Sequence, residues 1–125
     1  MKFRYARHTN NLNLLIDFYT KVIGLEVIGK FENHSYYNGV FLGHSDLDWH
    51  IEFTESNEEA KHIPDEDDLI VFYLNSEEEL NAIKKDAENL GFPLIKSKNP
   101  YWQKNGLEIK DPDGYGVILT IEKKN

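Results

Sequence analysis

The stretch that decides the fold is Asn99–Thr120, NPYWQKNGLEIKDPDGYGVILT. It predicts a β-hairpin, with one strand over Gly106–Lys110, a tight turn over Asp111–Gly114 and a last strand over Tyr115–Ile121. Pro112 presets φ for the second position of the turn, and the glycine that ends the turn tolerates a positive φ. Large apolar residues at every second position of the last strand indicate that one of its faces is buried.

The remaining chain repeats one order of elements. The first half predicts a strand at 3–7, a helix at 12–23 and strands at 25–31, 36–42 and 49–54. The second half predicts a strand at 69–74, a helix at 77–90, a strand at 92–96 and the two hairpin strands. A shift of about 67 positions places Gly24 on Gly91, and both glycines stand where a helix ends.

This repeat predicts an α+β fold of two βαβββ modules in one domain, residues 1–125. Module one spans about residues 1–55, a linker about 56–67, and module two about 68–125; the acidic stretch Glu55–Asp68 shows no apolar period. One helix covers only one face of each sheet. We therefore expect the modules to pair into a cupped, incomplete barrel around a cleft.

Composition excludes several classes of function. The chain has no cysteine, so it has neither a disulfide framework nor a thiolate metal site. Its net charge of −8 disfavours nucleic acid and anionic membranes as partners. It has no apolar run of membrane-spanning length and no phosphate-loop or dinucleotide motif. We expect a soluble cytoplasmic protein.

Three motifs follow one another along the chain: Phe18-Tyr19-x3-Ile23-Gly24-Leu25-x-Val27, then His50-Ile51-Glu52-Phe53, then Asp111-Pro112-Asp113-Gly114 before Val117-Ile118-Leu119. In this order they resemble the glyoxalase/bleomycin-resistance/extradiol-dioxygenase group, the vicinal oxygen chelate superfamily. The resemblance covers essentially the whole chain. It implies paired βαβββ modules around a site, and it predicts a homodimer.

The resemblance also implies where metal ligands would stand in the metal-using members, on the first and fourth strands of each module. Here these positions hold Arg4, Glu52, Leu69 (or Val71) and Ile118. Only Glu52 has a donor atom, and Arg4 is permanently cationic. We therefore predict that the protein holds no metal and no other cofactor.

Strand alternation places Arg4, His8, His50, Glu52 and Tyr73 on the sides of their strands that face the cleft. Two aromatic residues, Tyr101 and Trp102, follow Asn99-Pro100 in a predicted loop, where they could stack on a ligand or plug the barrel. These seven residues are the predicted ligand-binding set. No residue is assigned a catalytic role.

Two groups in this set allow alternative interpretations. Arg4 and Glu52 either form an ion pair that belongs to the fold or hold a charged group of a ligand. His8, His50 and Glu52 are either polar residues at the mouth of the cleft or an open metal triad.

The sequence therefore favours a metal-independent small-molecule binding protein of the glyoxalase/bleomycin-resistance type, which binds an organic ligand in the inter-module cleft. One alternative is a metal-dependent lyase or dioxygenase of the same superfamily. Another is a structural or regulatory dimer without a ligand.

Overall fold

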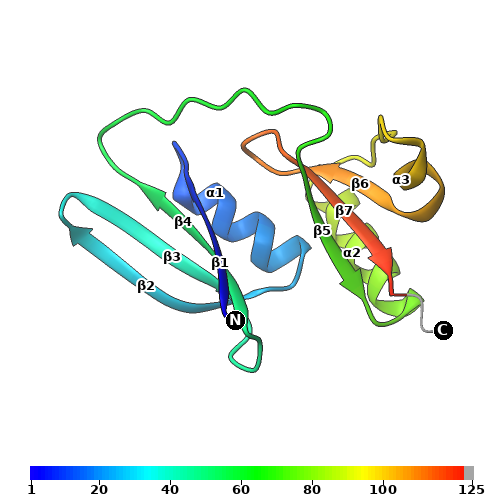
Figure 1. Cartoon of the computed structure of the whole chain (residues 1–125), viewed down its shortest axis with the longest axis horizontal. Helices are drawn as coiled ribbons and strands as arrows, with labels where there is room; N and C mark the ends of the chain where they lie inside the picture. The colour runs from blue at the N-terminus through cyan, green and yellow to red at the C-terminus, as the bar shows by residue number, and fades with distance from the viewer. Residues whose placement is uncertain (123–125) are drawn as a thin grey trace. The chain divides into compact units, whose positions relative to one another are not determined.

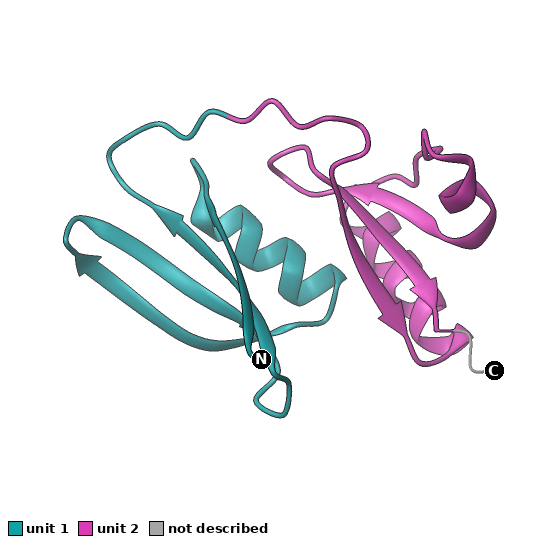
Figure 2. Cartoon of the chain, viewed as in Figure 1, with its two compact units in different colours: residues 1–61 teal, residues 62–125 magenta. Residues whose placement is uncertain are grey.

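The structure, a computed structural model, describes residues 1–122 of the chain. The chain forms two compact units, Met1–Lys61 and His62–Asn125 (Figure 2). Each unit has its own small sheet, of four strands in the first and three in the second, and its own helices. The predicted α+β class is thereby confirmed. Among the described residues, no helix is long and apolar enough to cross a membrane.

The first unit has the predicted order of one strand, one helix and three strands. Its elements are β1 (Phe3–His8), α1 (Leu12–Asp17), the π-helical turn η1 (Phe18–Val22), β2 (Glu26–His34), β3 (Tyr37–Gly43) and β4 (Trp49–Glu55) (Figure 1). The strand order in the sheet is β1-β4-β3-β2. β1 runs parallel to β4, and the other neighbouring strands are antiparallel.

Helix α1 covers one face of this sheet. Asn11 caps the helix, because its side chain accepts a hydrogen bond from the Leu14 backbone N–H at 3.2 Å. Tyr19 packs on Phe53 of β4, with ring centroids 5.1 Å apart. The buried core of the unit includes Leu15, Phe18, Tyr19, Val22, Val40, Leu42, Ile51 and Phe53. Residues of the opposite alternation, including His50 and Glu52, therefore lie on the other face of the sheet.

The second unit contains β5 (Leu69–Leu74), α2 (Glu77–Asn89), α3 (Pro100–Asn105), β6 (Leu107–Lys110) and β7 (Gly116–Ile121). The strand order is β5-β7-β6, with β5 parallel to β7. Ser76 caps α2 by accepting a hydrogen bond from the Glu79 backbone N–H at 3.2 Å. Gly91 follows the helix with φ at 85°.

The strand predicted at 92–96 is wrong. Only Ile95 pairs with β6, through a single bridge in which its N–H donates to the Glu108 carbonyl at 2.9 Å. Pro93 has no N–H to donate to a ladder. Ser97 directs its carbonyl to the Gln103 side chain of α3, at 2.7 Å, instead of to a strand.

The loop predicted around Tyr101 and Trp102 is also wrong, because these residues belong to helix α3. Asn99 accepts a hydrogen bond from the Tyr101 N–H at 2.9 Å, and Pro100 takes the first position of the helix. An asparagine cap followed by proline is a regular way to start a helix, although Asn-Pro is also common in loops.

The β2–β3 hairpin carries two rings of the site described below, and its turn is strained. Ser35 and Tyr36 form a two-residue loop with φ at 51° and 71°, as in a type I′ turn. This turn favours asparagine and glycine, because a side chain with a Cβ is disfavoured at positive φ. Tyr36 is also 82% exposed, so packing offsets little of this strain.

We predict that Tyr36→Gly raises the free energy of unfolding by about 0.5–1 kcal/mol, since glycine relieves the positive φ. Urea denaturation measures this change. The matched control is Tyr37→Gly on the adjoining strand, which should lower stability. A loss of stability in Tyr36→Gly would contradict the assigned turn.

Candidate functional site

The face of the first sheet away from α1 carries a row of aromatic rings. The rings of Phe31, Phe41 and His50 come from the three adjacent strands β2, β3 and β4. Ring centroids are 5.8 Å apart between Phe31 and Phe41, and 5.4 Å apart between Phe41 and His50. We call these three rings, with Arg4 and Glu52 at their β1 end, the aromatic platform.

Glycines make room for the two phenylalanine rings. The Phe31 ring lies so close to Gly39 of β3 that no side chain fits there. The Phe41 ring lies beside Gly29 of β2, where a Cβ would stand 3.1 Å from the ring. Each ring thus lies across the neighbouring strand rather than standing upright from the sheet. Both phenylalanines remain partly exposed.

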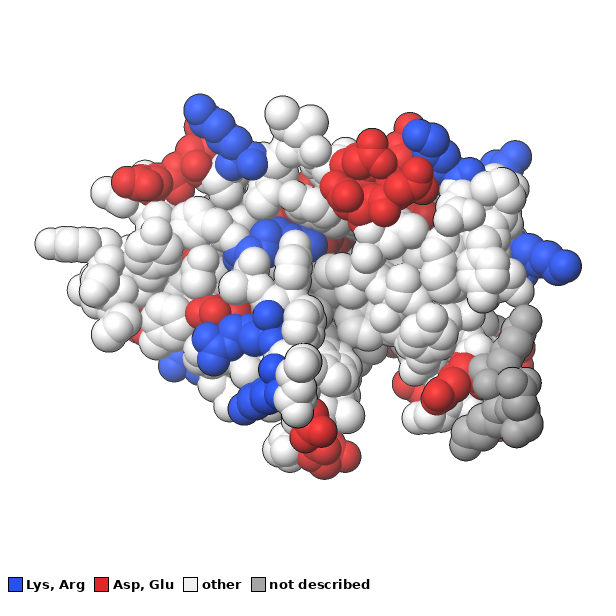
Figure 3. Space-filling model, viewed as in Figure 1, with Lys and Arg blue, Asp and Glu red and all other residues white. Residues whose placement is uncertain are grey.

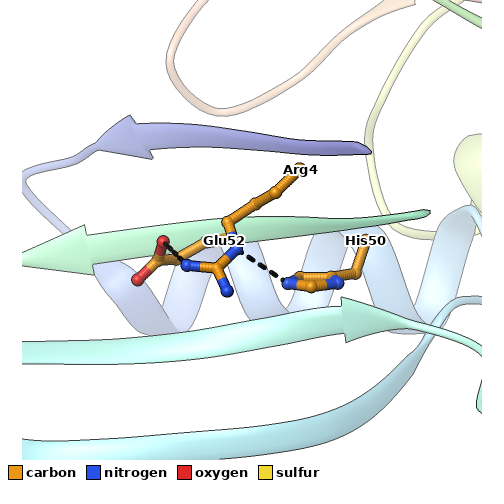
Figure 4. Close-up of polar contacts among 3 residues, drawn as sticks. All are labelled: Arg4, His50 and Glu52. Carbon is orange, nitrogen blue, oxygen red and sulfur yellow. Dashed lines mark hydrogen bonds and ion pairs between the residues drawn. The ribbon is translucent and has the colours of Figure 1, made fainter. Parts of the chain in front are cut away.

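Arg4 of β1 has three partners within the platform. Its Nε–H donates to His50 Nε2 at 3.0 Å, and its Nη1 lies 3.4 Å from Glu52 Oε1 (Figure 4). Its Cζ lies 5.2 Å from the centroid of the Phe41 ring, within the range of a cation–π contact. The parallel pairing of β1 with β4 creates this arrangement, because it places Arg4 directly opposite His50.

His50 must be neutral to accept the hydrogen bond from Arg4. Nε2 offers its lone pair to Arg4, so the ring proton belongs on Nδ1. Burial of the ring, whose residue is only 8% exposed, lowers the pKa of His50 below its usual 6.5. The charges of Arg4 and Lys2 lower the pKa of His50 further, whereas Glu52 opposes them.

The Arg4–Glu52 ion pair is in contact with solvent rather than buried. The side chain of Arg4 is 52% exposed and that of Glu52 is 14% exposed. A pair in such contact with water contributes between zero and about 1 kcal/mol to stability. The pair alone therefore gives little reason for an arginine at this position.

His8 lies at the other end of the same face and does not join His50. Its Nδ1 is 2.8 Å from Thr54 Oγ1 and its Nε2 is 3.1 Å from Ser56 Oγ. Both ring nitrogens are thus engaged by hydroxyl groups. In the described part of the chain, no three His, Cys, Asp or Glu side chains come together as a group that could hold a metal. The triad considered for His8, His50 and Glu52 is not assembled.

The structure places the other three predicted site residues in the second unit. Tyr73 lies on β5 with its side chain exposed. Tyr101 and Trp102 lie on α3, where their rings meet edge to face with centroids 4.8 Å apart. The aromatic platform is built from the first unit alone, without these residues.

The residues at the metal-ligand positions implied by the resemblance do not fit a metal. In the first unit, Arg4 directs its guanidinium at the one carboxylate, Glu52, and at His50 Nε2. In the second unit, Val71 and Ile118 pair across β5 and β7, and neither has a donor atom. The permanent positive charge of Arg4 thus occupies a position at which a metal cation would need a ligand.

Sequence reasoning missed three residues that the structure singles out. Phe31 and Phe41 each recur two positions from a glycine, in Gly29-x-Phe31 and Gly39-x-Phe41-x-Gly43, and this spacing was the available signal. Glu108 of β6 is only 3% exposed, and its carboxylate accepts a hydrogen bond from the Ser97 hydroxyl at 2.8 Å. An acid between Leu107 and Ile109 in a strand was the signal for that site.

Basic side chains gather over β1 in the view of Figure 3, with acidic side chains beside them. Lys2 and Arg4 supply positive charge near His50, and Glu52 opposes it. On the far edge strand β2, Glu26 lies 3.7 Å from His44. The β1 end of the platform is thus locally positive, within a chain of net charge −8.

We predict that Gly39→Ala lowers the free energy of unfolding by about 1–3 kcal/mol, because the new methyl group overlaps the Phe31 ring. In a Phe31→Ala background the same substitution should cost little. Urea denaturation of the four proteins completes the cycle. Additive effects of the two substitutions would show that the ring does not lie over Gly39.

We predict that stability falls as the pH is lowered from about 7 to 5, by at most about 1.4 kcal/mol per pH unit from His50. The unfolded state takes up a proton near pH 6.5, whereas folded His50, with its lowered pKa, does so only at lower pH. Urea denaturation at several pH values measures the slope. His50→Gln should reduce the slope, and a slope in that variant equal to that of the unsubstituted protein would contradict the assignment.

Comparison with known proteins places the chain in a family. Residues 3–54 match the YycE-like N-terminal domain, and residues 67–120 match the YycE-like C-terminal domain. The uncharacterized protein YycE of Bacillus subtilis is 37% identical over 123 residues, which cover 98% of this chain and 88% of that protein.

Solved structures agree with this match. The crystal structure of Bacillus subtilis YycE, a protein of unknown function, has a TM-score of 0.89 at 36% identity, covering 99% of this chain and 91% of that one. Glyoxalase I of Leishmania major shares the fold, with a TM-score of 0.74 at 24% identity over 98% of this chain and 86% of that one. The chain therefore belongs to the YycE-like family, within the glyoxalase/bleomycin-resistance/extradiol-dioxygenase superfamily.

Proposed function

We propose that this protein is a metal-independent small-molecule binding protein, and that it binds an organic ligand on the aromatic platform. One observation carries the proposal: two partly exposed phenylalanine rings lie across glycines of neighbouring strands, beside an anchored, half-exposed arginine. Apolar surface with a few fixed polar groups is the usual composition of a small-molecule site.

The glycines support a ligand role for the rings. A sheet face that only had to be covered could use upright valine or isoleucine side chains, which favour strands. Gly29 and Gly39 weaken their strands by comparison, because glycine loses more conformational entropy on folding. This cost makes room for two tilted rings across the strands, whose exposed faces and edges can contact an aromatic ligand.

Arg4 supports independence from metal. It supplies a permanent positive charge at the position where the metal-using members of the superfamily would place a ligand. Binding of a polar group by this guanidinium needs no deprotonated protein ligands and no bound cation.

We predict that protein treated with EDTA binds flat aromatic fragments. Nuclear magnetic resonance spectra of isotope-labelled protein, recorded with a fragment library, should show shifts centred on Phe41, His50 and Arg4. Phe41→Ala should lose this binding. Phe3→Ala is the matched control, since Phe3 is an exposed aromatic residue of the same unit on the opposite side of β1.

Two results would contradict the proposal. One is fragment binding that begins only after zinc or manganese is added to the EDTA-treated protein. The other is a set of spectra in which no fragment shifts the platform resonances, which would favour a structural or regulatory protein without a ligand.

A further inference from the structure

The aromatic platform already contains a cation of its own. The Arg4 guanidinium lies over the Phe41 ring and beside the Glu52 carboxylate. These are the two features that would attract a positively charged ligand, an aromatic face and an acid. A cationic ligand would have to displace Arg4 from both, and would meet its repulsion.

The Arg4 guanidinium also has more N–H donors than its partners use. Of its five N–H groups, one donates to His50 and one to Glu52. Across residues 1–122, the remaining three, including both on Nη2, have no partner in the structure, and the side chain is 52% exposed. The Cζ that carries these groups lies 5.2 Å from the centroid of the Phe41 ring, so the donors are close to the rings that a ligand would contact.

The existing partners of Arg4 fix its position, but they neither neutralise its charge fully nor use all of its hydrogen-bond donors. His50 is neutral, so it orients the guanidinium but does not neutralise its charge. Glu52 lies at 3.4 Å, longer than the distance of about 2.7–2.9 Å typical of a strong charge-assisted hydrogen bond. Lys2 adds a second positive charge near His50. An incoming carboxylate therefore finds an oriented cation with free donors.

We propose that the ligand of the platform is a planar aromatic acid, whose carboxylate binds the free N–H groups of Arg4 while its ring packs against the exposed parts of Phe41 and Phe31. This inference rests on the proposed function and names the ligand class for the same site. A carboxylate matches the planar fork of a guanidinium, and an aromatic ring joined to it provides the apolar surface that can pack against the phenylalanines.

Three probes of the same ring size test the proposal: naphthoate, its neutral methyl ester, and a naphthyl trimethylammonium salt. Affinities are measured by calorimetry or by resonance shifts at constant ionic strength. We expect naphthoate to bind about tenfold or more tighter than the ester, and the cation to bind weakest.

Arg4→Met should reduce the preference for naphthoate over the ester to within about twofold. Arg4→Lys, which keeps the charge but loses the fork, should give an intermediate preference. The matched control is Lys30→Met, which removes one positive charge from the same unit at an exposed position of β2 that pairs with Val40 on the α1 side. It should retain the full preference.

The outcomes separate this inference from the proposed function. Equal binding of acid and ester, or tightest binding of the cation, would overturn the ligand class while a ligand-binding platform remains. An acid preference unchanged in Arg4→Met would also overturn it. Binding of none of the three probes would overturn both proposals.

Discussion

A guanidinium cannot give up its proton, so every group around Arg4 must accept a permanent positive charge. This constraint orders the face of the first sheet. His50 has to be neutral with its Nε2 unprotonated, Glu52 has to turn its carboxylate to the guanidinium, and Phe41 has to present its face. Phe41 can do so because Gly29 of the next strand leaves space for its ring. One side chain thereby determines the protonation or orientation of three others.

The two halves of the chain share an order of elements, but their sheets carry different side chains. The first unit keeps all four strands and uses glycines to lay rings across them. The second unit loses one strand at Pro93, and it buries the Glu108 carboxylate with Ser97. Gly116 leaves room for that carboxylate, since a Cβ there would stand 2.8 Å from its oxygen. The repeat thus keeps the backbone plan, while single residues decide what each sheet presents.

Sequence patterns sufficed for the elements whose signals are local. Periodicity and caps located both main helices, and alternation placed Arg4, His50 and Glu52 on one face. The failures have equally local causes, because Pro93 removed a ladder donor inside an apolar run and the Asn99 cap outweighed a loop-like dipeptide.

The aromatic platform, in contrast, could not be predicted by analysing one strand at a time. That Phe31 lies over Gly39 depends on the cross-strand register, which an irregularity shifts near the hairpin turn. That Arg4 meets His50 as well as Glu52 depends on the parallel pairing of two strands far apart in the chain.

The single bridge at Ile95 has a consequence for the motions of the second unit. The outer border of β6 is held by one backbone hydrogen bond, whereas every strand border inside the first sheet is held by a ladder. Opening that border breaks one backbone hydrogen bond rather than a ladder, so we expect it to require less free energy than global unfolding. We therefore expect the amide hydrogens of residues 94–96 to exchange with solvent through local fluctuations, more readily than those inside the ladders of the first sheet.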